Sequence, residues 1–253
     1  MKKYLLGAAA VLAIALPGVA SAQQSGYVDL GYQSTDGSVS GVDFDGDGWT
    51  LGGTTAWGGD GTVGVQLDAI YGDSEDASSY SVGGHLFSRN EGYLIGGFAN
   101  YGSIDVDGAG SSDQWTVGLE GQAYLTRTTL DGALSYSESD DADAQLTAFD
   151  VGATHFVTDN FSFGGSVGFG TLDAFGTDTD IVSYGVGAEY QFAATPISVF
   201  GGWQHVDLDD FDTDADTLNV GVRYNWGGSL FERNRSGASL ARGGGLGRYA
   251  GLY

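Results

Sequence analysis

The chain has 253 residues, with 33 acidic side chains against nine basic ones, 45 glycines, two prolines and no cysteine. Such an excess of acids argues against a nucleic-acid partner, because binding to nucleic acid depends on cations that neutralise phosphates. The absence of cysteine excludes a small domain held together by disulfides. Abundant glycine makes a poor water-soluble core but suits strands whose inner face is lined by small residues.

Residues 1–22 have the pattern of a secretory signal peptide. A charged head at 1–3 precedes the apolar run 5–16, Pro17 and Gly18 interrupt it, and the small residues of 20–22 offer a cleavage motif. The apolar run is shorter than the roughly 20 residues of a transmembrane helix. We therefore expect export and cleavage after Ala22, which leaves arginine as the only strongly basic residue of the mature chain.

Beyond the leader, apolar residues recur at every second position in twelve segments, the period of a β-strand with two different faces. The predicted strands are 26–35, 48–57, 62–71, 79–87, 93–101, 114–125, 128–136, 145–156, 161–170, 181–192, 197–205 and 217–226. Most have about the 9–11 residues that a tilted strand needs to cross a bilayer. Tight turns alternate with longer connections rich in Asp, Ser and Gly, at 36–47, 72–78, 102–113, 137–144, 171–180 and 206–216. This arrangement predicts an all-β fold for residues 23–226, a transmembrane antiparallel up-and-down β-barrel of twelve strands.

The two faces of the predicted strands differ in charge. One face carries large apolar residues and all five tryptophans, mostly near strand ends, as an interfacial aromatic girdle requires. The other face carries every charge inside a predicted strand: Asp29, Asp68, Glu120, Asp131, Asp150, Glu189 and Arg223. A shift of one residue would turn all seven toward lipid, so we assign them to the lumen as pore-lining residues. A soluble β-sandwich also alternates, but its apolar face would be a packed core of aliphatic residues.

The last predicted strand resembles the terminal assembly signal of bacterial outer-membrane barrels, through Asn219, Gly221, Tyr224 and Trp226. Together with the alternating strands, this signal makes residues 1–226 similar to a small porin-type outer-membrane β-barrel protein of Gram-negative bacteria. The resemblance implies a multi-pass protein of the outer membrane, in contact with lipid and lipopolysaccharide and inserted by the barrel-assembly machinery. It leaves the oligomeric state open. No predicted loop is long enough to fold inward like the constriction loop of large trimeric porins.

The inward face predicts a narrow water-filled pore. It has a glycine in eleven of the twelve predicted strands, and six carboxylates against one guanidinium make its field negative. We therefore expect passive diffusion of small hydrophilic solutes and ions, with a preference for cations. Two alternatives stay open: a plugged barrel in which the charges form buried networks, and a structural or adhesive barrel without transport activity.

Neither an enzyme nor a cofactor is predicted. Outer-membrane phospholipases have a barrel of the same strand number and a catalytic His followed two residues later by a nucleophilic Ser. None of His85, His155 and His205 has a serine at that place. A second motif, Asp43, Asp45 and Asp47, resembles the start of a calcium loop, but no Glu follows at the twelfth position. These aspartates are weak metal candidates, and we interpret the acidic loops as a solvated surface that gathers cations.

The tail, residues 227–253, breaks the alternating pattern. It is rich in glycine and holds Arg233, Arg235, Arg242 and Arg248 with the single acid Glu232. Such a composition predicts a flexible periplasmic segment. Its charge also motivates the hypothesis that it folds back into the acidic lumen as an electrostatic plug.

Overall fold

The computed structural model describes residues 24–58, 63–108, 110–139, 141–174, 176–209 and 212–242. The predicted signal peptide with its cleavage site at Ala22 lies outside the described residues, as does Arg248 of the tail. Within the described ranges, no helix combines the length and the apolarity that a bilayer crossing requires.

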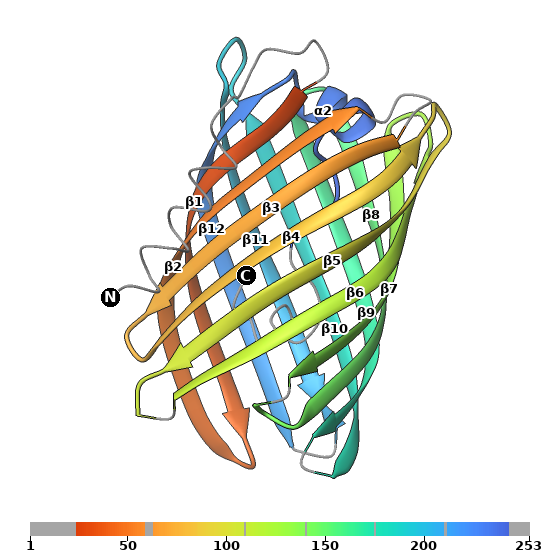
Figure 1. Ribbon diagram of the computed structural model, residues 1–253. Coiled ribbons are helices and arrows are strands. Elements are labelled where there is room, and N and C mark those ends of the chain that lie inside the picture. The colour runs from red at the N-terminus through yellow and green to blue at the C-terminus, as the bar shows by residue number, and fades with distance from the viewer. Residues whose placement is uncertain are drawn as a thin grey trace.

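Twelve antiparallel strands close into a barrel (Figure 1), so the predicted fold is confirmed. Each strand pairs with its sequence neighbours, and the first strand pairs with the last from Gly26 opposite Trp226 to Val39 opposite Thr213. No strand edge is left unpaired around the described wall. The strands are β1 Gln24–Val39, β2 Val42–Gly58, β3 Val63–Ser74, β4 Ala77–Arg89, β5 Tyr93–Val106, β6 Gly110–Tyr124, β7 Thr128–Ser139, β8 Ala144–Thr158, β9 Phe161–Ala174, β10 Thr177–Gln191, β11 Ile197–Leu208 and β12 Thr213–Trp226.

The strands are longer than predicted, and the six longer connections are mostly strand. The predicted loop 36–47, for example, belongs to β1 and β2, which meet at Ser40 and Gly41 with φ of 51° and 77°. Positive φ at both positions suits a tight hairpin turn. Asp, Ser and Gly have low β-propensity, but the backbone ladders override propensity here. They also bring polar partners together, as in the 2.7 Å bond from Ser38 Oγ of β1 to Asp214 Oδ1 of β12.

The assignment of faces agrees with exposure. Apolar side chains of the predicted lipid face are open to the outside, among them Leu119 at 68% and Trp49 at 41% exposed. The predicted lumen face is closed to the outside, and Asp29 and Asp68 are each 2% exposed. The alternation thus places an apolar belt on the outer face and the charged residues on the lumen face, as a membrane barrel requires.

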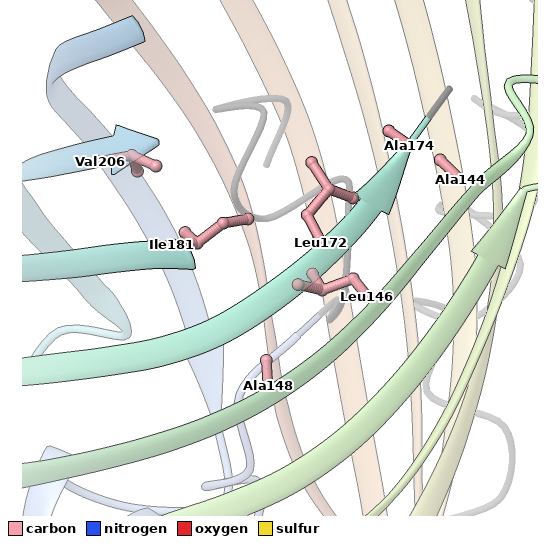
Figure 2. Close-up of a cluster of buried hydrophobic side chains, with 7 residues drawn as sticks. All are labelled: Ala144, Leu146, Ala148, Leu172, Ala174, Ile181 and Val206. Carbon is pink, nitrogen blue, oxygen red and sulfur yellow. The ribbon is translucent and has the colours of Figure 1, made fainter. Parts of the chain in front are cut away.

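An apolar cluster that the sequence analysis did not predict lies on the inward face of β8–β11, at the end of the barrel opposite the tail (Figure 2). Leu146, Leu172 and Ile181 form its centre, and Leu146 is completely buried. Its residues fall in or beside the segments predicted as polar loops. Because these strand extensions were not predicted, the apolar packing at this end of the barrel was not predicted either.

The described part of the tail, residues 227–242, includes a helix where a flexible segment was expected. Its helix α2, Leu230–Ser236, lies at the end of the barrel where the short turns are (Figure 1). Ser229 caps the helix in a capping box with Glu232. The physical reason for the difference is tertiary: Phe231 donates its backbone N–H to Asp159, and buried Leu230 and Arg233 face the barrel.

Candidate functional site

Arg223 joins two of the predicted lumen carboxylates. The register of β1 and β12 places Asp29 opposite Arg223, and Arg223 Nε lies 3.3 Å from Asp29 Oδ2. Its Nη1 donates to Glu189 of β10 at 2.6 Å. The rings of Tyr27 and Phe200 lie 4.0 and 4.8 Å from the guanidinium carbon. Two carboxylates and two aromatic rings hold this cation against one side of the wall.

A second cluster is centred on His85. Its Nε2 lies 2.8 Å from Asp68 Oδ2, and its Nδ1 lies 2.8 Å from Glu120 Oε1. All three side chains are at most 8% exposed. Carboxylates accept hydrogen bonds, so both contacts are satisfied together by a ring that carries a proton on each nitrogen. Thr54 Oγ1 and Gln66 Nε2 donate to Asp68 as well, which completes a buried polar network across β2–β4 and β6.

The remaining two predicted acids lie on the other half of the barrel. Asp150 is 9% exposed on β8, whereas the Asp131 side chain of β7 borders an open space. That space has a volume of about 470 Å³ and follows β8–β11, with Glu189, Gln204 and Asn219 among its polar lining. The filled network and the open space thus occupy different sectors of the lumen.

The inward glycines have two different roles, although only one of them, leaving room for a water-filled pore, was predicted. Gly164, Gly185 and Gly202 border the open space and keep that wall thin. A Cβ at Gly52 would instead collide with the guanidinium of Arg242, and one at Gly221 with the ring of Phe200. In the second group, glycine makes room for a large side chain rather than for water.

The lumen holds more positive charge than the one guanidinium predicted. Arg89, the last residue of β4, points inward and is 1% exposed, and the tail adds Arg233 and Arg242. Arg89 continues the alternation through His85 and Phe87, so a longer predicted strand would have found it. Arg242 carries no such local signal, because its position depends on how the tail enters the barrel.

The weak metal candidates Asp43, Asp45 and Asp47 lie on β2, not in a loop. Across the described ranges, no group of three or more acidic or histidine side chains gathers closely enough to hold a metal.

The proposed assembly signal divides between the two faces of β12. Asn219 borders the open space and Gly221 lies beneath the Phe200 ring, both on the lumen side. Tyr224 is 57% exposed on the outer face, and Trp226 shares that face. The motif therefore combines a close-packed inner surface with an aromatic outer one.

A closed barrel with an apolar outer belt and a charged, partly open lumen defines an outer-membrane channel architecture. The model of the family described as Gram-negative porin matches residues 91–230, and the chain belongs to that family. The protein is thus a porin-like channel of the outer membrane. No curated protein matches the sequence.

Solved structures share the barrel at low sequence identity. An outer membrane channel from Pseudomonas putida F1 superposes with a TM-score of 0.62 at 9% identity, over 80% of this chain and 95% of that one. The translocator domain of the autotransporter NalP from Neisseria meningitidis gives 0.57 at 12% identity, over 89% and 94% of the two chains. A protein titled KdgM porin gives 0.52 at 12% identity, over 78% and 99%. At such identities, the likeness shows the fold alone.

Proposed function

We propose that the protein allows passive diffusion of small hydrophilic solutes and ions across the outer membrane, with a preference for cations. One observation carries the proposal: the space of about 470 Å³ along β8–β11, walled by glycines and small polar residues and bordered by Asp131 and Glu189. A space of this kind holds water, because its lining supplies several hydrogen-bonding groups. Solutes would move through it without a bound cofactor.

The direction of the preference follows from where the cations lie. Arg223 and Arg242 contact Asp29, and His85 lies between Asp68 and Glu120. Of the two acids that border the open space, Glu189 is paired with Arg223, and Asp131 lies on β7 at the edge of that space. Acidic residues also dominate the hairpins at the far end, for example Asp173 and Asp178, and would raise the local cation concentration at that mouth.

Planar-bilayer recording with a salt gradient tests this proposal through the K⁺/Cl⁻ reversal potential. We expect a cation preference that weakens in Asp131→Asn, because one negative charge leaves the wall of the open space. Glu91→Gln is the matched control, since this exposed residue of the turn between β4 and β5 borders neither that space nor the acidic hairpins and should change the reversal potential less. A preference for chloride would contradict the proposed cation preference. An unchanged reversal potential in Asp131→Asn would show that Asp131 does not determine the ion preference.

The competing function is a structural or adhesive barrel without transport activity, and a folded protein that carries no current would favour it. An enzymatic role is not part of the proposal. Both ring nitrogens of His85 are engaged by carboxylates. That ring therefore has no nitrogen left to take a proton from a serine hydroxyl.

Export and assembly complete the proposal. Residues 1–22 would direct the chain through the inner membrane, with cleavage after Ala22. The signal through Asn219, Gly221, Tyr224 and Trp226 would then engage the barrel-assembly machinery, and the apolar belt would contact lipid and lipopolysaccharide. Pulse-chase analysis of the Ala22→Arg variant tests the cleavage site, because a bulky charge at this position should block processing.

A further inference from the structure

The tail segment, residues 229–242, crosses the mouth of the barrel at the end with the short turns (Figure 1). Helix α2 begins beside the turn between β8 and β9, where Phe231 N–H donates to Asp159 O at 3.0 Å. The chain then passes to the opposite wall, where Ala238 N–H donates to Ser25 Oγ of β1 at 2.7 Å. A segment anchored at both of these points spans the opening.

On either side of the second anchor, the segment bonds to further strands of the wall. Gln66 Nε2 of β3 donates to Leu240 O at 3.0 Å, and Arg89 Nη2 of β4 donates to Gly237 O at 2.9 Å. Gln122 Nε2 of β6 donates to Ser239 O at 3.1 Å. The Leu240 side chain, 5% exposed, packs against the inward residues Phe87 and Leu94. Backbone groups of the segment are thus satisfied by wall side chains, as a buried position requires.

Two arginines of the segment meet the acids of the lumen. Arg242 Nη1 lies 3.0 Å from Asp29 Oδ2, in the room left by Gly52. Arg233 Nη1 donates to Gln191 Oε1 at 3.1 Å, and its Nη2 lies 3.9 Å from Glu189 Oε1. Burial lowers the pKa of Arg233 to about 10, so the group stays charged at neutral pH. The segment therefore adds two positive charges where the sequence analysis expected an acidic field.

Beside the segment, a smaller space remains. It measures about 250 Å³ and lies between Ala238–Ala241 on one side and Thr154, Ser162 and Glu189 on the other. The last three residues also border the larger space of about 470 Å³. A solute that follows the open sector would therefore leave it through the gap between wall and tail segment.

We propose that the tail segment is the constriction of this channel, and that Arg233 and Arg242 make it a determinant of ion selectivity. The proposal rests on the channel function above and says which part of the chain limits flow. The connections between the strands are too short to fold inward and narrow the pore. The proposal assigns that role to the tail segment instead. Removing the segment should widen the opening, and removing its charges should leave the lumen more negative.

Single-channel conductance and K⁺/Cl⁻ reversal potential test the proposal on three variants. A chain ending at Gly228 keeps β12 whole, and its conductance should rise by about twofold or more because the opening is no longer spanned. The full-length variant Arg233→Gln/Arg242→Gln should show a stronger cation preference. Arg235→Gln is its matched control, because this arginine of the same segment donates to the backbone carbonyls of Leu125 and Thr128, beside the turn between β6 and β7, rather than to a lumen acid.

The third variant exploits the absence of cysteine from the chain. Ala241 is exposed in the gap, so Ala241→Cys treated with a bulky thiol reagent should lose about half or more of its current. This measurement decides the question even if the shortened chain does not assemble. Unchanged current after labelling, or equal conductance of the full and shortened chains, would overturn the constriction. If folded barrels of every variant are silent, the channel function itself fails.

Discussion

His85→Ala should destabilise the barrel strongly, since it removes the cation from between two buried carboxylates. Asp68 and Glu120 are 3% and 8% exposed at their side chains, and each lies 2.8 Å from a ring nitrogen of His85. Removing one partner of a buried ionic group costs about 3–5 kcal/mol, because the charge left behind stays out of water. Lost stacking of the ring on Phe98, at 5.6 Å between centroids, adds to this.

The free energy of unfolding, from denaturant titration of the protein in lipid vesicles, measures this loss. His155→Ala is the control: this exposed histidine lies 3.0 Å from the Thr128 hydroxyl and packs on the Phe163 ring, bridges no pair of carboxylates, and should cost about 1 kcal/mol or less. Adding Asp68→Asn to His85→Ala should recover about 1 kcal/mol or more, because one of the two stranded charges disappears. A loss below about 1 kcal/mol for His85→Ala alone would refute the picture of a bridging imidazolium.

Two further predictions concern the faces of the wall and the inward apolar cluster. Val220→Arg places a charge on the lipid face of β12 and should lower the free energy of unfolding by up to about 2–4 kcal/mol. Asn219→Arg, one residue away on the lumen side, should lower it far less. Equal losses would mean that the two faces are misassigned. Leu146→Ala should lower the free energy of unfolding by about 2–5 kcal/mol, because this side chain is completely buried in the inward apolar cluster. An unchanged free energy of unfolding in the same titration would show that the cluster does not contribute to stability.

How far the sequence predicts this barrel depends on how local the signal is. Strand number and faces were predictable, because successive side chains of a strand point to opposite sides whatever the neighbouring strands do. Val220 outside and Asp29 inside follow from that rule alone. Strand ends were not predictable in the same way. Asp43 and Ser38 are poor strand formers, and the ladders that β1 forms with β2 and β12 keep them extended.

The candidate site shows the same division. The sequence alone determined that the charges share one face and that this face is turned from lipid, since a mistake of one residue would expose all of them to hydrocarbon. Which cation meets which acid was decided only by the tertiary structure. The contact of Arg242 with Asp29 joins residues 213 positions apart, and it exists because the chain turns back after β12 and enters the mouth of the barrel. No periodicity encodes such a path, which depends on packing across a closed wall that forms only when all the strands have paired.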